Sequence, residues 1–166
     1  MLRLIDPEFR VREVRYYDYE AIVELVQENA PHFDVTNYQM DRPVEEHAIF
    51  VAEDSDGRIL GWIEGQTDSH YIGPGTDPVH PKPHGNGLYL VVDASARRMG
   101  VGRALTRAFA QACADAGCTW MFMLPDENDG VEGRLAFFKT LGFVDLAPGD
   151  DEHAAWGMPL ASLLEG

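Results

Sequence analysis

The sequence predicts one α/β domain with three layers, in which helices flank a mixed β-sheet. The first observation is the order of its patterns. Short apolar runs typical of strands alternate with stretches that repeat apolar residues about every 3.6 positions, as helices do. From the N-terminus the order is strand, helix, three strands, helix, strand, helix and two strands. The second observation is the length of 166 residues, which suits a single domain, residues 1–166, with a substantial core.

The first third of the chain predicts a strand, a helix and an irregular segment. Polarity alternates from Phe9 to Tyr16, which is typical of a strand. Asp18 is placed to cap the helix that follows. The buried face of that helix would consist of Ala21, Ile22, Leu25 and Val26. Residues 30–47 carry two prolines and are predicted to be irregular, with room for a short helix around Val44 to His47.

A hairpin and a long loop come next. Ile49–Glu53 and Arg58–Gln66 are predicted strands, because the Asp54–Gly57 segment between them is a hairpin turn signal. The loop from Thr67 to Gly85 carries four prolines and three glycines, and loops of this length in a compact domain are often functional. Its histidines are His70, His80 and His84. Prolines between the last two histidines exclude a shared helical face, so no metal site is predicted.

The centre of the chain predicts a strand that enters a helix through a glycine-containing turn. Leu88–Val92 is a short run of apolar residues, as expected of a buried strand. From Val101 to Ala116 apolar residues recur with the period of a helix that has one buried face. Gly117 is the expected C-cap of this helix. The turn between strand and helix contains Gly100 and Gly102.

The last quarter predicts a strand, a helix and a closing pair of strands. Thr119–Leu124 is the strand and Val131–Leu141 is the helix, which ends at Gly142. Phe143–Leu146 and Ala154–Met158 are expected to pair as the last two strands.

The net charge of −15 is unevenly distributed. Only residues 93–118 are net basic, with four arginines against two aspartates. An acidic chain with one basic window argues against nucleic acid as a partner. It allows an anionic cofactor at that window and a cationic substrate elsewhere, although acidity that serves only solubility is the alternative.

Targeting signals and cysteines suggest a cytoplasmic protein. No apolar run is long enough to span a bilayer, and the N-terminus has no signal-peptide pattern. The two cysteines, Cys113 and Cys118, fall on the central helix and just after it. We expect them to be reduced core residues rather than a disulfide or a metal site.

The glycine turn is a candidate anion site. The first N–H groups of a helix have no partner within the helix, and glycines let an anion approach the backbone. Arg97, Arg98 and Arg103 add positive charge, so we expect a pyrophosphate to bind here. The alternative is a tight turn with solvated arginines. The sequence lacks both the Walker motif and the dinucleotide-binding glycine motif.

Two segments resemble the GNAT superfamily of N-acetyltransferases. Arg97-Arg98-Met99-Gly100-Val101-Gly102 is similar to the coenzyme A motif of that family, Arg/Gln-x-x-Gly-x-Gly/Ala. About forty residues further on, Leu135 to Phe143 looks like the closing helix of the family and its Leu-Gly-Phe ending. With the upstream elements, the resemblance covers nearly the whole chain.

The resemblance implies transfer of an acetyl group from acetyl-CoA to a primary amine. It implies a sheet that splays between the strands Leu88–Val92 and Thr119–Leu124, with pantetheine in the gap and pyrophosphate over the turn. The implied cofactor-binding residues are Leu90, Val91, Val92, Arg97, Arg98, Met99, Gly100, Val101, Gly102, Arg103, Ala104, Asn128 and Phe138. The acceptor stays open among small cationic amines, aminoglycosides, amino acids and peptide amines. Neither nucleic acid nor membrane is expected as a partner, and a homodimer is compatible with the family.

The reaction needs a group that removes a proton from the incoming ammonium. We expect Glu64 to be this base, because it lies on a strand beside the central one. The alternative for Glu64 is a solvent-facing strand carboxylate. His84 and Glu53 are the next candidates. Asn86 stands where some family members carry a catalytic glutamate.

The chain departs from the family at the closing helix. Many members carry a tyrosine four residues before the glycine of Leu-Gly-Phe, and here that position holds Phe138. Where an asparagine is usual near the start of the helix, this chain has Val131, and Asn128 is expected to serve in its place. A phenylalanine cannot donate a proton, so the usual general acid is absent. A non-catalytic acyl-CoA-binding or sensor module is therefore the alternative function, and a plain interaction protein is a third.

Overall fold

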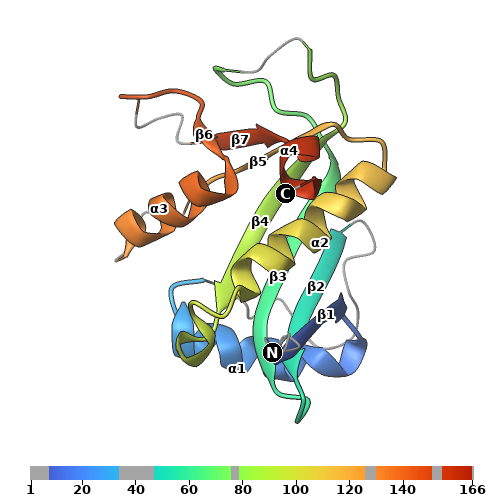
Figure 1. Cartoon of the computed structure of the whole chain (residues 1–166), viewed down its shortest axis with the longest axis vertical. Helices are drawn as coiled ribbons and strands as arrows, with labels where there is room; N and C mark the ends of the chain where they lie inside the picture. Colours follow the sequence, from blue (N-terminus) through green and yellow to red (C-terminus); the bar gives the residue numbers. More distant parts are fainter. Residues whose placement is uncertain (1–7, 34–46, 76–78, 126–129, 151–154, 166) are drawn as a thin grey trace, which may run out of the picture. The chain divides into compact units, whose positions relative to one another are not determined.

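The computed structural model describes residues 8–33, 47–75, 79–125, 130–150 and 155–165. Within these ranges the strands form one sheet in the order β1-β2-β3-β4-β5-β7-β6 (Figure 1). The element order confirms the predicted alternation and a mixed sheet with flanking helices. The strands are β1 (Phe9–Glu13), β2 (His47–Asp54), β3 (Ile59–Ser69), β4 (His84–Val92), β5 (Trp120–Met123), β6 (Val144–Asp145) and β7 (Trp156–Pro159). The helices are α1 (Tyr19–Asn29), α2 (Val101–Asp115), α3 (Val131–Leu141) and α4 (Leu160–Leu164), with 3₁₀ turns η1 (Tyr16–Asp18) and η2 (Ala94–Ala96).

Two compact units make up the chain: residues 1–64 with 89–108, and residues 65–88 with 109–166. The long elements β3, β4 and α2 contribute residues to both units. The expectation of a single domain over residues 1–166 stays a prediction.

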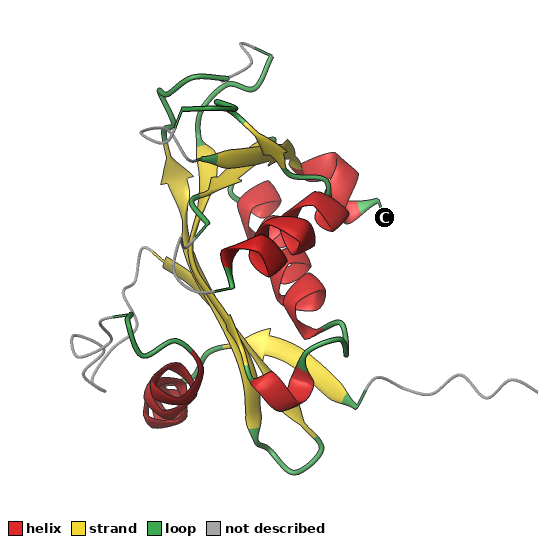
Figure 2. Ribbon diagram, turned by 90° about the vertical axis from the view of Figure 1, so that its left-hand side faces the viewer, coloured by secondary structure: helices red, strands yellow, loops and turns green. Residues whose placement is uncertain are grey.

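In the first unit, α1 covers one face of the sheet and the start of α2 covers the other (Figure 2). Trp62 on β3 is fully buried in a cluster with Ile22 and Val26 of α1. Its neighbour Gly61 faces α2, where an added Cβ would lie 2.8 Å from the Leu105 side chain and 2.9 Å from that of Val101. Consecutive residues of a strand point to opposite faces. The absence of a side chain at Gly61 therefore lets α2 lie close to the sheet.

In the second unit, β5 is the central strand. Gly85, Asn86 and Gly87 of β4 pair in parallel with Met121, Phe122 and Met123. On its other side β5 pairs antiparallel with β7, and β7 pairs with β6. Gly157 on β7 lies against the ring of Trp120, so a larger residue there would clash with that ring. The resulting core contains Phe109, Cys113, Met121, Met158 and Leu163, each at most 2% exposed.

The structure corrects the predicted first strand and its helix cap. The strand ends at Glu13, and Tyr16–Asp18 forms a 3₁₀ turn. Asp18 makes no side-chain hydrogen bond to the N-terminus of α1. Instead its Oδ2 accepts the backbone N–H of Arg15 at 2.7 Å. The cause is a partner on the preceding strand, because Arg12 of β1 binds the Asp18 carboxylate.

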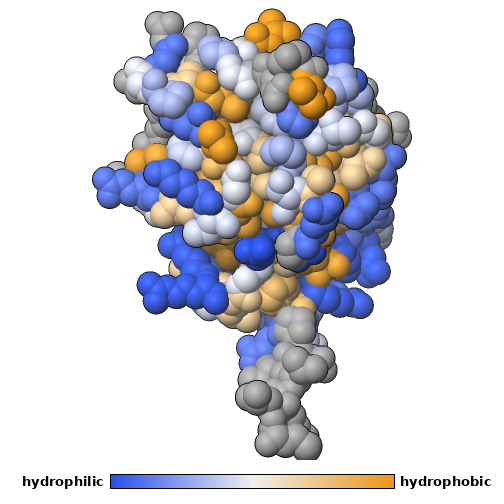
Figure 3. Space-filling model, turned by 45° about the horizontal axis from the view of Figure 1, so that its top comes forward, coloured by the Kyte–Doolittle hydropathy of each residue, from blue (hydrophilic) through white to orange (hydrophobic). Residues whose placement is uncertain are grey.

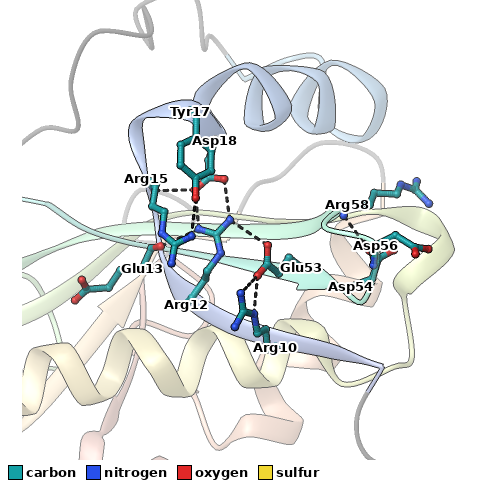
Figure 4. A network of polar contacts seen from close by, with 10 residues as sticks. All are labelled: Arg10, Arg12, Glu13, Arg15, Tyr17, Asp18, Glu53, Asp54, Asp56 and Arg58. Carbon is teal, nitrogen blue, oxygen red and sulfur yellow. Dashed lines mark hydrogen bonds and ion pairs between the residues drawn. The ribbon is translucent and has the colours of Figure 1, made fainter.

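Figure 4 shows this network of Arg12. Its guanidinium donates to both oxygens of Asp18 at 2.8 and 2.9 Å, and to Oε2 of Glu53 at 3.1 Å. Arg10 donates from Nε to Oε1 of Glu53 at 2.6 Å. Hydrogen bonding from Arg12 holds the pKa of Glu53 below its ordinary value, against the opposing effect of burial. The network ties β1 both to β2 and to the start of α1.

Other differences concern the ends of strands and two short elements. β3 continues to Ser69 and β4 begins at His84, so the predicted long loop is shorter and His84 lies on a strand. His47 begins β2, where a short helix was expected to end. Residues 44–46 lie outside the described ranges. Neither the 3₁₀ turn Ala94–Ala96 nor the helix α4 was predicted.

The described surface exposes a few large apolar side chains. On the face that Figure 3 draws, hydrophobic groups form separate patches among hydrophilic ones. The most exposed are Tyr16, Ile72, Val79, Leu124 and Val144. Exposed apolar residues that stand apart from one another are ordinary on a globular protein. Among the described helices, none combines the length and apolar character that crossing a membrane requires.

Candidate active site

The turn between β4 and α2 contains two residues with a left-handed backbone. β4 ends at Val92 and α2 begins at Val101. Between them, φ is 70° at Arg98 and 86° at Gly100. A left-handed conformation costs a non-glycine residue about 1–2 kcal/mol. The conformation of Arg98 must therefore be stabilised by the residues around the turn.

This geometry suits a bound anion. Left-handed residues in a turn bring successive N–H groups to the same side, which makes a concavity for an anion. The first intrahelical bond runs from the amide of Ala104 to the Gly100 carbonyl at 3.0 Å. The amides of residues 101–103 precede that bond, at the positive end of the helix dipole. Arg97, Arg98 and Arg103 are exposed around them, so the residues present fit the pyrophosphate of coenzyme A.

Asp93 holds the first half of this turn. Its amide donates to the Leu60 carbonyl at 2.8 Å. Its buried carboxylate accepts the backbone N–H of Ser95 at 3.1 Å and also bonds the Ser95 hydroxyl. Arg58 donates to the same oxygen at 3.1 Å. The bond from the Ser95 hydroxyl is the largest cause that lowers the pKa of Asp93 from its ordinary value.

Asn29, the last residue of α1, contacts the same turn. Its Nδ2 donates to Oδ1 of Asp93 at 3.1 Å and to the Leu25 carbonyl at 2.9 Å. Its Oδ1 accepts the backbone N–H of Ala94 at 2.9 Å. The end of α1 is thereby fixed to the chain that leads into the candidate anion site. Neither Asn29 nor Asp93 was predicted as a site residue, because their contact joins segments distant in sequence.

The strand before the turn, β4, extends beyond the residues that pair with β5. The register pairs only residues 85–87 of β4, and the strand continues from Leu88 to Val92. Leu90 and Val92 are half-buried. Backbone groups on that part of β4 are the ones expected to pair with pantetheine. The pairing pattern is compatible with the expected splay, which stays a prediction.

The other predicted cofactor residues of the first unit differ in how far their side chains are exposed. Val91 and Val101 are 5% and 1% exposed, so their side chains belong to the core and only their backbone is available. Met99 is 38% exposed. Gly102 and Ala104 are half-buried in the first turn of α2. The carbonyl of Gly102 accepts the Thr106 hydroxyl at 2.7 Å, which directs that hydroxyl back onto the helix.

Glu64, the predicted base, is fully buried. Its Oε2 lies 2.7 Å from Nδ1 of His47, whose side chain is 14% exposed. The alternative interpretation of Glu64 as a solvent-facing strand carboxylate is therefore wrong. A buried carboxyl group can exchange protons with an acceptor only through another group. The sequence reasoning missed His47, since it becomes a neighbour of Glu64 only when β2 and β3 pair.

His84, the second candidate base, is engaged at both ring nitrogens. Its Nδ1 accepts the backbone N–H of Tyr71 at 3.1 Å, and its Nε2 lies 2.8 Å from the carbonyl of His80. An acceptor at Nδ1 and a donor at Nε2 describe a neutral imidazole. The side chain is 2% exposed, so its visible role is to hold the loop before β4. Among the described residues, no cluster of three or more potential metal ligands occurs.

Glu53 bonds to the neighbouring strand β1, and Asn86 lies in the part of β4 that pairs with β5. Both oxygens of Glu53 accept from arginines on β1, so this third candidate base serves to hold the sheet edge. Asn86 lies on β4 opposite Phe122 and is half-buried.

On α3, Phe138 is 5% exposed. Its ring packs edge-on against that of Phe143, with 5.3 Å between the ring centroids. Asn128 lies outside the described residues. The expected contacts of Asn128 and Phe138 with coenzyme A stay predictions.

Comparisons with known proteins agree on the family. The model of the acetyltransferase (GNAT) family matches residues 7–143. No curated protein matches the chain. A GNAT acetyltransferase from Staphylococcus aureus superimposes with a TM-score of 0.66 at 13% identity, covering 92% of this chain and 99% of that one. An Escherichia coli GNAT N-acetyltransferase in complex with CoA gives 0.65 at 18% identity, covering 98% and 88%.

A third similar structure is an aminoglycoside 6'-N-acetyltransferase from Acinetobacter baumannii. Its TM-score is 0.68 at 14% identity, covering 86% of this chain and 95% of that one. At these identities the solved structures establish the fold. The family model covers well over half of the residues and includes the strand, turn and helix described above. The chain therefore belongs to the GNAT family of acetyltransferases.

Proposed function

We propose that this enzyme transfers an acetyl group from acetyl-CoA to a primary amine, and that the preferred acceptors are cationic. Membership of the GNAT family establishes that the protein is an acyltransferase that acts on amines. The donor and the acceptor class are the parts that we propose.

The observation that carries the proposal is the left-handed turn before α2. Arg98 and Gly100 together turn the chain into the helix, and exposed arginines stand beside the first amides of that helix. Amides and guanidinium groups are the usual donors to a phosphate. In this role the turn binds the cofactor at its pyrophosphate, and the backbone of Leu90 and Val92 orients the pantetheine. Similar structures from Escherichia coli and Thermoplasma acidophilum contain coenzyme A, which supports this choice of donor.

Charge supports the choice of acceptor. The chain carries 28 acidic and 13 basic residues, for a net charge of −15. Such a protein attracts cations over distances of about 10 Å at ordinary ionic strength. One protein with a similar fold is named as an aminoglycoside N-acetyltransferase, and aminoglycosides are polycationic amines. The rate constant kcat/KM for a cationic amine should accordingly fall when salt is added.

The chemical contribution of this chain would be positioning and proton transfer. Bound acetyl-CoA supplies an activated acetyl thioester. Holding an amine next to that group replaces an encounter in solution with a reaction inside one complex. The protein must also accept a proton from the ammonium form of the amine. The leaving thiolate is a weak enough base to depart near neutral pH without a tyrosine, which agrees with a phenylalanine at position 138.

A turnover assay over a panel of amines tests the proposal. The release of free thiol from acetyl-CoA should be measured with polyamines, aminoglycosides, amino acids and peptides, at low and high salt. Release with at least one cationic amine, suppressed by salt, is the expected result. If calorimetry shows that CoA binds but no amine releases thiol, the non-catalytic binding module is the better description. A preference for anionic or uncharged acceptors at low salt would contradict the proposed acceptor class.

A further inference from the structure

The proposed reaction needs a proton acceptor, and the described residues include a pair of side chains suited to this role. Glu64 is fully buried on β3, and its Oε2 lies 2.7 Å from Nδ1 of His47 on β2. The imidazole is at the edge of the buried region, with 14% of the side chain exposed. A buried carboxylate and a partly exposed imidazole therefore form a pair that no local sequence motif shows.

The fold explains why the two residues meet. The amide of Asp54 donates to the Arg58 carbonyl at 3.0 Å, which closes the hairpin between β2 and β3. On β2, His47 shares its strand face with Ile49 and Val51, and on β3 Glu64 shares its strand face with Trp62. Ile49, Val51 and Trp62 belong to one buried cluster, so His47 and Glu64 lie on the same face of the hairpin.

The pairing of β3 with β4 places Glu64 beside the strand that is expected to bind the cofactor. The amide of Asp93 donates to the Leu60 carbonyl, so the start of β3 lies beside the end of β4. Counting four residues along each strand brings Glu64 level with Tyr89. The ring of Tyr89 stacks on that of Trp62, with 5.2 Å between the ring centroids. Trp62 and Glu64 are two residues apart on β3, so their side chains lie on the same face of the sheet. Glu64 and Tyr89 therefore lie on the same face, one residue away from Leu90.

Glu64 has a second titratable neighbour, Tyr19 of α1. The phenol of Tyr19, at the start of α1, is 1% exposed. Burial raises its pKa to about 12, and the negative charges of Glu64 and Asp18 add to that effect. A neighbouring anion disfavours the phenolate, which is the direction found here.

We propose that Nε2 of His47 accepts the proton of the incoming ammonium and that Glu64 positions the His47 ring. This inference rests on the proposed acetyl transfer. A carboxylate at Nδ1 keeps the imidazole proton on that nitrogen, so Nε2 carries the lone pair. The same carboxylate stabilises the imidazolium that forms. His47 thereby replaces Glu64 as the group that meets the amine.

The proton and electron balance is complete without another reactant. Nε2 of His47 takes one proton from R–NH₃⁺, which leaves a lone pair on the amine nitrogen. That nitrogen forms a bond to the acetyl carbon as the carbon–sulfur bond breaks and its electron pair leaves with sulfur. A second proton from the nitrogen neutralises the thiolate. The imidazolium returns its proton to water, which restores the neutral imidazole beside the carboxylate.

Two small amines separate a catalytic role of His47 from a structural one. Near neutral pH ethylamine is mainly protonated, whereas 2,2,2-trifluoroethylamine is similar in shape and mainly neutral. His47→Gln and Glu64→Gln should lower kcat/KM for ethylamine by about 10²- to 10⁴-fold, the usual contribution of a general base. Each variant should retain most of its rate with trifluoroethylamine, which needs no deprotonation before it attacks. His70→Gln, which alters an exposed histidine, is the matched control and should change neither rate.

Equal losses with both amines would show that His47 and Glu64 only support the fold, and the proposal would be overturned. A second measurement needs no acceptor at all. The ¹⁵N chemical shifts of His47 in the wild-type protein should show a protonated Nδ1 and an unprotonated Nε2, and Glu64→Gln should abolish that preference. The opposite tautomer in the wild type would also overturn the proposal. Because this result does not depend on turnover, failure of the pair is distinguishable from failure of the proposed acetyl transfer.

Discussion

Asn29 and Asp93, which end α1 and follow β4, are joined by a hydrogen bond of 3.1 Å from Nδ2 to Oδ1. The same amide side chain accepts the backbone N–H of Ala94 at 2.9 Å. One residue of α1 thus fixes both the carboxylate and the backbone that begin the turn toward α2. This contact couples the stability of the first unit to the geometry of the candidate anion site.

Asn29→Ala is therefore expected to weaken the binding of CoA. Hydrogen bonds to a charged group contribute about 1.5–3 kcal/mol, and the variant removes one to Asp93 and one to the Ala94 amide. We expect a roughly tenfold higher Kd for CoA, equivalent to about 1.4 kcal/mol, together with a lower free energy of unfolding. Calorimetry and urea denaturation measure the two quantities. Glu28→Ala, which alters an exposed neighbour on α1, is the control, and an equal change in Kd there would contradict this account.

Two glycines allow a matched test of the left-handed turn. Gly100 has φ of 86° and Gly57, in the β2–β3 hairpin, has φ of 83°; an added Cβ would meet no atom within 4 Å at either position. Alanine at each should lower the free energy of unfolding by a similar amount, about 1 kcal/mol, through backbone strain alone.

Only Gly100→Ala is expected to weaken CoA binding, because only Gly100 belongs to the turn that presents the amides of α2. The Kd for CoA is measured by calorimetry on both variants after their folding is verified. The assignment of the pyrophosphate to this turn fails if Gly57→Ala weakens binding as much as Gly100→Ala does.

The Glu53 carboxylate makes the stability of the first unit depend on pH. Hydrogen bonding from Arg12 lowers the pKa of Glu53 in the folded protein, so the folded state favours the charged form. The resulting stabilisation is present above the pKa of the unfolded chain and is lost as the pH falls through the lower, folded pKa. Denaturation at a series of pH values should show the wild type more stable than Glu53→Gln near neutrality, by about 1–3 kcal/mol.

That difference between wild type and Glu53→Gln should shrink as the solution becomes acidic. Glu13→Gln serves as a control, because Glu13 is an exposed carboxylate on the same strand as Arg12. A constant difference at all pH values would mean that the variant acts through packing and not through charge.

Helix boundaries were predictable where a local signal fixes them. The predicted helix Val131–Leu141 agrees with α3, and its C-cap residue, Gly142, has φ of 106°. The predicted start of the central helix at Val101 is also confirmed, and Gly117 after it has φ of 96°. Glycine is favoured in left-handed caps whatever the rest of the fold does. Such signals can therefore be read from the sequence.

Strand ends and site contacts were less predictable because they depend on contacts between different elements. Asp18 has the sequence signature of a helix cap, but Arg12 engages its carboxylate. The pair of His47 and Glu64 exists only in the register of the β2–β3 hairpin. Counting outward from the predicted turn at Asp54–Gly57 does not predict the pair, because it brings His47 level with residue 65 and would turn Glu64 to the opposite face.

Phe138→Tyr tests whether the missing tyrosine matters. Phe138 is 5% exposed and packs edge-on against Phe143, so a new hydroxyl must find a hydrogen-bond partner or pay a desolvation cost of about 1–3 kcal/mol. If the para position points toward the thioester, that partner is the leaving sulfur.

We then expect an unchanged Kd for CoA and an equal or higher kcat for Phe138→Tyr. The wild type should show a rate that rises as the base deprotonates and stays level to about pH 9, because a thiol with a pKa of about 8.5 leaves without a proton donor. The pH profiles of both proteins, with circular dichroism to verify folding, measure this. A steep alkaline fall in the folded wild type would reveal a proton donor elsewhere. Lost stability together with lost CoA binding in the variant would place Phe138 in the core of the second unit and not at the sulfur.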